Sequence, residues 1–265
     1  MPSVRQVDQD PREELELGFS NHMGIRMTQP SLSRATRVLA RESSLLDFRT
    51  PSHVYNPLIY AWDAHREYLR RYGALRGRVL LLGMNPGPWG MTQTGVPFGD
   101  VTMVREWFGI ETRLGDVLPE QHPRYPILGM ACHRNEGSGS RLWRWAEARL
   151  GPPEEFFSRF FVWNYCPLLF IKDGRNLTPE RLDRDEREAL MVVCDRALAA
   201  VVRTLQPTAV VGIGHYAEGR ATAVLGTDAD VRYLHHPSPA NPTANRDWPS
   251  LAERALGPWL PPLRR

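Results

Sequence analysis

The fold is decided by residues 78–100, RVLLLGMNPGPWGMTQTGVPFGD. The stretch opens with Val79 to Leu82, a continuous apolar run of the kind that forms a strand buried on both faces of a parallel sheet. It then breaks into glycines and prolines, and the first polar side chain is Asn85. Ligands of open α/β sheets bind beyond the carboxyl ends of strands. The stretch therefore predicts a ligand loop, with a plain surface turn as the alternative.

The composition of this loop favours a defined shape. Pro86 biases the residue before it, Asn85, towards an extended conformation. Four glycines allow positive φ angles and a close approach of the backbone to a flat ligand. They are Gly87, Gly90, Gly95 and Gly99.

Three further apolar runs are expected to be strands of the same sheet. They are residues 160–163, 208–214 and 231–235. Apolar residues at helical spacing predict helices between and around them, at 31–46, 61–72, 101–108, 142–150, 182–205, 215–225 and 248–256. Residues 54–58 are expected to be a short extended piece. Alternating strands and helices favour a three-layer α/β/α fold with a central four-stranded parallel sheet.

The domain organisation follows from periodicity and length. Residues 1–30 mix charged and turn residues with little periodicity and are expected to be a flexible arm. Residues 31–265 are long enough to form one domain with a single core. On the helix at 61–72, Asp63, His65 and Glu67 are expected to belong to a solvated face rather than to a polar site.

Composition excludes several classes of protein. No apolar run approaches the roughly 20 residues of a membrane span, and the N-terminus lacks the apolar segment of a signal peptide, so an intracellular location is expected. The three cysteines, Cys132, Cys166 and Cys194, are widely spaced and predict buried reduced thiols without a metal or a disulfide. The formal net charge of +3 permits a polyanionic partner without requiring one.

Four polar or glycine residues fall at the carboxyl ends of the predicted strands. They are Asn85, Asn164, Gly214 and His236. Together with the ring of Phe98 they predict a nucleobase pocket, because a carboxamide matches the donor and acceptor edge of a base and a ring stacks on its face. His235 and His236 point to opposite sides of an extended chain, so only one can face the pocket. We favour His236, with a purely structural histidine as the alternative.

The expected chemistry is hydrolysis through a dissociative transition state. The sequence holds no metal-ligand spacing, Walker motif or GxSxG motif, and the loop has no carboxylate before Asp100. Asn85 has no useful basicity and can only orient a water through its carbonyl oxygen. A weak nucleophile suffices when an oxocarbenium-like state forms and the leaving group is stabilised. Cleavage of a pyrimidine N-glycosidic bond fits, with His236 donating to, or electrostatically supporting, the departing base.

Four segments together resemble one known family. They are residues 83–99 (GMNPGPWGMTQTGVPFG), 236–239 (HPSP), 163–170 (WNYCPLLF) and 55–58 (YNPL). They are similar to segments of the single-strand-selective monofunctional uracil-DNA glycosylases, within the uracil-DNA glycosylase superfamily. The resemblance implies that Asn85 positions the water, Phe98 stacks on uracil, Asn164 reads its edge and His236 stabilises the leaving group. It also implies substrate contacts by Gly83, Met84, Gly87 and Met91, of which Gly87 and Met91 would flank C5 of the pyrimidine.

DNA contacts are expected in three places around the pocket. These are the polar loop 133–141, which is equally compatible with a plain helix cap, the strand-to-helix turn after residue 213, and the loop after His236. The candidate residues are Ser138, Arg141, Gly214, His215, Ser238, Pro239, Ala240, Asn241 and Arg246. The family motif usually continues HPSPR, and here Ala240 replaces the arginine that belongs to the duplex-wedging loop. A weak wedge predicts a preference for single-stranded or mismatched uracil, unless Asn241 or Arg246 substitutes.

The predicted activity is therefore that of a monofunctional glycosylase. A lyase step needs an amine nucleophile, and Lys172 is the only lysine. Expected partners are uracil-containing DNA, single- or double-stranded, and free uracil as product, with no cofactor, no metal, no membrane and a monomeric chain. Two alternatives remain: a glycosylase acting mainly on deaminated purines (hypoxanthine, xanthine), and a non-catalytic binder of damaged DNA.

Overall fold

A computed structural model describes residues 31–262, so the arm expected at residues 1–30 lies outside the described part. Its central sheet has four parallel strands in the order β3-β2-β6-β7. The strands are β2 (Val79–Gly83), β3 (Phe160–Asn164), β6 (Ala209–Ile213) and β7 (Val231–Leu234). The predicted four-stranded parallel sheet is confirmed. The carboxyl end of β2 lies beside that of β3, where Gly83 pairs in register with Asn164.

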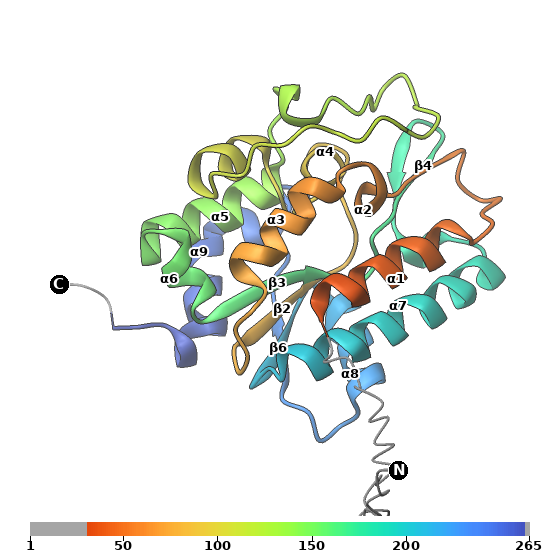
Figure 1. The fold of residues 1–265 in the computed structure, drawn as a ribbon. Helices are drawn as coiled ribbons and strands as arrows, with labels where there is room; N and C mark the ends of the chain where they lie inside the picture. The colour runs from red at the N-terminus through yellow and green to blue at the C-terminus, as the bar shows by residue number, and fades with distance from the viewer. Residues whose placement is uncertain (1–30, 263–265) are drawn as a thin grey trace, which may run out of the picture.

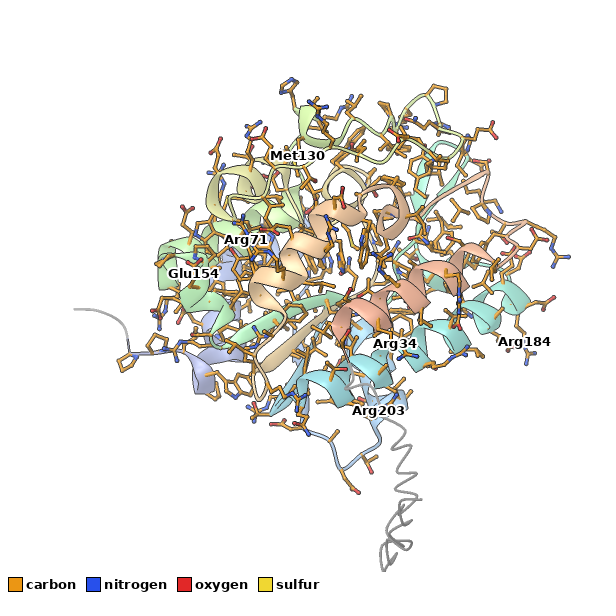
Figure 2. The ribbon with its side chains drawn as sticks, viewed as in Figure 1. Arg34, Arg71, Met130, Glu154, Arg184 and Arg203 are labelled. Carbon is orange, nitrogen blue, oxygen red and sulfur yellow. The ribbon has the colours of Figure 1, made fainter. Side chains whose placement is uncertain are left out.

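Helices cover both faces of this sheet, as predicted (Figure 1). One group contains α1 (Leu32–Ser44), α7 (Arg184–Leu205) and α8 (His215–Leu225). The other contains α5 (Gly137–Leu150), α6 (Pro153–Phe157) and α9 (Pro242–Leu256), with α3 (Trp62–Tyr72) leading into β2. The short helical elements are α2 (Pro57–Tyr60), α4 (Met91–Thr94), η1 (Met103–Trp107), η2 (Gly129–Ala131), η3 (Pro179–Arg181) and η4 (Gly257–Trp259). Side chains fill the space between the layers (Figure 2).

An aromatic cluster holds strand β3 in place. Tyr72 stacks on Phe157 with ring centroids 4.0 Å apart, and Tyr68 lies 5.4 Å from Phe161. The Tyr68 hydroxyl donates to the carbonyl of Val162 at 2.8 Å. Burial of each large apolar side chain contributes on the order of 2 kcal/mol. The cluster therefore fixes the strand that ends at the site.

A second, antiparallel sheet was missed by sequence reasoning. It consists of β1 (His53–Tyr55), β4 (Leu169–Lys172) and β5 (Arg175–Leu177), in the order β1-β4-β5. The extended piece expected at residues 54–58 ends at Tyr55, because the Asn56 side chain accepts from the N–H of Leu58 at 3.2 Å and caps α2. The β4–β5 hairpin forms one wall of the site described below.

Two helices begin earlier than predicted. Helix α5 starts at Gly137 because the Glu136 carboxylate caps it, so the cap alternative for the loop at 133–141 is correct. Helix α9 starts at Pro242, capped by Asn241, and has a non-helical kink at Asp247. The helix predicted from residue 248 corresponds to its second half. Arg246 consequently lies on a helical turn and not in a loop.

The expectation of a solvated face on α3 is wrong for His65. Its side chain is only 1% exposed, and Nδ1 lies 2.7 Å from the carbonyl oxygen of Gly95. Because that oxygen can only accept, Nδ1 carries the proton. Burial lowers the pKa of His65 to about 4. A neutral histidine on α3 therefore holds the ligand loop at Gly95.

Two further expectations concern thiols and membranes. The three cysteines are free and buried, as predicted. Within residues 31–262, no helix has both the length and the hydropathy that crossing a bilayer requires.

Candidate functional site

A cavity of about 410 Å³ opens at the carboxyl ends of β2 and β3. Segments distant in sequence meet there: the loop after β2, the start of α5, strand β5 and the loop after β7. The lining residues are Met84, Asn85, Pro86, Gly87, Pro88, Met91, Phe98, Glu136, Ser138, Asn164, Asn176, Thr178, His236, Ser238 and Pro239. Asn85, Phe98, Asn164 and His236, which sequence reasoning selected, thus share one cavity.

Within residues 31–262, the side-chain oxygen of Asn85 has no hydrogen-bond partner. Its Nδ2 donates to the carbonyl of Leu168 at 3.0 Å and lies 3.4 Å from the carbonyl of Pro86. These contacts fix the amide plane and use the donors, so Oδ1 remains for a water or a ligand. The contact to Leu168 also ties the loop to the segment between β3 and β4.

Asn164 and Phe98 approach each other over Gly83. A Cβ atom on Gly83 would lie 2.3 Å from Asn164 Oδ1 and 2.6 Å from Cε2 of Phe98, so any side chain there would displace both. Asn164 Nδ2 lies 3.3 Å from Met91 Sδ, while its buried Oδ1 has no partner in the described protein. An unpaired buried acceptor costs on the order of 1–3 kcal/mol, which a ligand N–H would recover. The bare backbone of Gly83 therefore makes room for a ligand-reading amide and a ring.

Phe98 is oriented by a strained backbone position. Its φ of 54° lies in the left-handed region, and its carbonyl accepts from Trp143 Nε1 at 2.9 Å. The Phe98 ring faces His236, with centroids 5.8 Å apart. Among the four loop glycines, which all allow a positive φ, only Gly95 adopts one, at 71°.

His236 is a neutral donor in this cavity. Burial lowers its pKa to about 4. Its Nδ1 accepts the backbone N–H of Ser238 at 3.1 Å, which leaves the proton of the neutral ring on Nε2. The neighbouring His235 does not line the cavity, and its Nδ1 lies 3.0 Å from the Tyr233 hydroxyl. The structure therefore distinguishes the two histidines as the alternation of an extended chain predicted.

Sequence reasoning missed Glu136, whose carboxylate lies in the cavity wall. Its side chain accepts the N–H of Ser138 at 3.2 Å and that of Gly139, at the N-terminus of α5. Burial raises the pKa of Glu136, while these hydrogen bonds lower it. Because the carboxylate already occupies the two amides, they are not open to a phosphate. An acidic residue directly before the Gly-Ser-Gly-Ser helix start was the available signal.

Asn176 and Thr178 were also missed, and they come from the β4–β5 hairpin. Asp173 and Gly174 form its turn, with φ angles of 51° and 67°. An Asp-Gly pair between two extended runs is a strong hairpin signal. That pair could have revealed the hairpin, but not its position beside the cavity.

The candidate DNA-contact residues divide into two groups. Ser138, Ser238 and Pro239 line the cavity. Gly214 lies beside it, since a Cβ there would be 3.5 Å from Cβ of His236. Ala240 is exposed at the rim.

The remaining candidates are engaged elsewhere or lie further out. Arg141 donates to Asn245 Oδ1 at 3.0 Å, and His215 stacks on Tyr233 with centroids 4.2 Å apart. The Asn241 side chain caps α9 and donates to the carbonyl of His236 at 3.1 Å, so it braces the histidine and is not free to act as a wedge. Arg246 is exposed on α9. Within the described residues, no group of three His, Cys, Asp or Glu side chains is arranged to hold a metal ion.

Comparisons with known proteins identify relatives of this chain. Residues 70–255 match the model of the uracil DNA glycosylase superfamily. The chain is 47% identical over 225 residues to the single-strand selective monofunctional uracil-DNA glycosylase of Rattus norvegicus, covering 82% of this chain and 80% of the relative. The corresponding Bos taurus protein is 46% identical over 207 residues, covering 77% and 76%.

A solved structure supports the fold independently. The crystal structure of SMUG2 from Pedobacter heparinus superimposes with a TM-score of 0.57, covering 84% of this chain and 96% of that chain at 16% identity. At that identity the likeness concerns the fold alone. The sequence relatives and the superfamily match decide the family: this chain belongs to the single-strand-selective monofunctional uracil-DNA glycosylases of the uracil-DNA glycosylase superfamily.

Proposed function

We propose that this chain hydrolyses the N-glycosidic bond of uracil in DNA and leaves an abasic site, the first step of base excision repair. One observation carries the proposal: Phe98, Asn164, Asn85 and His236 line the same cavity. The relatives named above are uracil-DNA glycosylases that are single-strand selective and monofunctional. The substrate is DNA inside the cell, and the base is flipped out of the strand to reach the cavity.

Asn164 and Phe98 would recognise the flipped base. The uracil ring stacks on Phe98, the unpaired Oδ1 of Asn164 accepts from N3–H, and Nδ2 donates to O4. Cytosine lacks the N3–H and would leave Oδ1 unpaired. Leaving a buried polar group unpaired costs about 1–3 kcal/mol, so the amide selects uracil.

Asn85 and His236 would act on the two sides of the bond that breaks. The C1′–N1 bond breaks first, and its electron pair leaves with the base as an anion delocalised over O2 and O4. The Nε2–H of neutral His236 donates to O2 as this charge grows. A water held by Oδ1 of Asn85 adds to C1′ and gives its proton to solvent, because an amide is too weakly basic to take it. The uracil anion then takes up a proton from solvent, so the products are uracil and an abasic deoxyribose.

The position of Lys172 supports a reaction without a lyase step. It is the only lysine of the chain, and a Schiff base needs an amine. Lys172 is exposed at the end of β4 and is not one of the cavity-lining residues of the described chain. We expect no covalent adduct with DNA when borohydride is added during turnover.

The test is excision from defined oligonucleotides. Purified protein is incubated with single strands that each carry one uracil, 5-hydroxymethyluracil, hypoxanthine or xanthine, and alkali then cleaves any abasic site. We expect cleavage at uracil, with Asn85→Ala as the inactive control. Cleavage only at the purines would make the chain a deaminated-purine glycosylase. Binding without cleavage of any strand would make it a sensor of damaged bases.

A further inference from the structure

We propose that a row of four contacting side chains beside the cavity binds, through its two exposed arginines, the unpaired DNA strand that flanks the flipped nucleotide. The four are Arg134, Trp89, Tyr125 and Arg124, here called the stacking ladder. The inference rests on the proposed function, since it takes DNA as the substrate. It assigns a separate binding surface to residues outside the cavity.

Successive contacts define the stacking ladder. The guanidinium carbon of Arg134 lies 4.5 Å from the centroid of the Trp89 ring. The Trp89 ring lies 5.6 Å from that of Tyr125, and the guanidinium carbon of Arg124 lies 5.7 Å from Tyr125. Arg124 Nη1 and the Tyr125 hydroxyl both donate to the carbonyl of Gly174, at 3.1 and 3.0 Å. The stack therefore runs to the turn of the β4–β5 hairpin and is fixed at that end.

The stacking ladder is continuous with the wall of the base cavity. Pro88, the residue before Trp89, lines the cavity, and so does Glu136, two residues after Arg134. The hairpin that holds the other end contributes Asn176 and Thr178 to the same cavity. A strand whose base occupies the cavity must leave across the rim. The chain segments that carry the two ends of the ladder thus continue into residues of the cavity wall.

The chemistry of this surface suits an unpaired strand. Arg134 and Arg124 are exposed. The guanidinium group of Arg134 packs on Trp89, and that of Arg124 packs on Tyr125. An immobilised guanidinium plane stacks on a base and also pairs with phosphate. Only unpaired bases have free faces to offer, because bases in a duplex stack on one another. The ladder therefore favours a single strand over a duplex.

The surrounding charge agrees with a polyanionic partner. Residues 120–136 and the hairpin at 169–177 together carry four basic side chains and three carboxylates. The basic side chains are Arg124, Arg134, Lys172 and Arg175, and the carboxylates are Glu120, Glu136 and Asp173. A local excess of positive charge attracts phosphates and makes binding salt-dependent.

The experiment compares exposed arginines on two sides of the molecule. Arg134→Gln, Arg124→Gln and the double variant remove the ladder's charge, while Arg203→Gln on α7 is the matched control. Figure 2 shows Arg203 on the opposite side of the fold from Met130, which belongs to the ladder's segment. The probe is a single-stranded oligonucleotide with a central 2′-fluorinated deoxyuridine, which resists hydrolysis, and a 2-aminopurine on its 5′ or 3′ side. Dissociation constants and 2-aminopurine emission are measured for both probes.

We expect Arg134→Gln to weaken binding about 5-fold or more, because stacking of one base is worth at least that factor. It should also restore the emission of one of the two 2-aminopurine probes, which stacking quenches in the unmodified chain. Arg203→Gln should change neither quantity. Excision of uracil from a trinucleotide with abasic spacers on both sides, which offers the ladder no neighbouring base to stack on, should change much less in the ladder variants.

Two results would overturn the inference. One is an Arg134→Gln protein that matches the control in affinity and emission. The other is an equal loss on the trinucleotide, which would locate the effect in the base cavity. Either result leaves uracil excision by the unmodified chain intact. Failure of the unmodified chain to bind or excise would instead refute the proposed function.

Discussion

Acidification from pH 7 to pH 5 should destabilise the folded chain by about 4 kcal/mol through His65 and His236 alone. Burial lowers the pKa of each to about 4, whereas an unfolded histidine has the ordinary value of about 6.5. At pH 7 both states are mostly neutral. Between pH 6.5 and 4 the unfolded state binds more protons, so the free energy of unfolding falls as the pH falls. Between pH 7 and pH 5, the linkage relation gives a loss of about 2 kcal/mol of unfolding free energy for each histidine. The total loss for each is about 3 kcal/mol once the pH lies below 4.

The assay is urea unfolding at pH 7, 6 and 5, followed by tryptophan fluorescence. His65→Asn is the informative variant, because an amide nitrogen can replace Nδ1 as the donor to Gly95 but cannot titrate. The variant will have its own stability at pH 7, so the quantity of interest is the slope with pH. We expect the fall between pH 7 and 5 to shrink by about 2 kcal/mol relative to the unmodified chain. An unchanged slope would show that His65 is not held neutral by burial, and the reasoning would fail.

Three further predictions concern the cavity and its rim. Asn85→Ala should lower single-turnover excision by about 100-fold or more, because the variant loses the oxygen that orients the water. Binding of a non-hydrolysable uracil oligonucleotide should change less than about twofold. An equal loss of binding would assign Asn85 a structural role, through the Nδ2 contact with Leu168 that the variant also loses. Gly83→Ala should abolish excision, because its Cβ would fall 2.3 Å from Asn164 Oδ1, and normal rates in a steady-state assay would contradict this geometry. The unmodified chain should excise uracil faster from a single strand than from a duplex in which uracil lies opposite adenine. Ala240→Arg should reduce the difference between these two rates, because it restores a wedge residue. Equal rates of the unmodified chain on both substrates would refute the idea that its wedge is weak.

The strand ends could be predicted because local signals and tertiary burial agree there. Helix α8 was predicted at its observed bounds, His215–Leu225. Gly214 and Gly226 flank it with positive φ angles of 92° and 82°, which most other residues adopt only at a cost. The apolar runs of the central sheet are buried on both faces, so their pattern leaves little ambiguity. The resulting order of strand ends brought Asn85 and His236 to one cavity.

The failures have a different physical origin. The residues 137–140 have loop-like composition, and only the Glu136 carboxylate at the N-terminus makes them helical. His65 occupies a helix position whose burial depends on the ligand loop that packs against it, and no periodicity within the helix reports that contact. Thr178 reaches the cavity because the hairpin folds back towards β2, which is a long-range event. Local pattern predicts elements, whereas these contacts depend on how the elements pack.

The charges of the cavity explain how its chemistry can proceed without a strong base. A dissociative reaction must tolerate a base that becomes anionic, so a bare carboxylate beside it would oppose bond breaking. Among the described residues that line the cavity, Glu136 is the one acidic residue, and its side chain accepts from two amides at the positive end of α5. Asn85, Asn164 and neutral His236 present dipoles and no net charge. The site therefore stabilises a departing anion through neutral donors, while the backbone amides at the start of α5 offset the charge of Glu136.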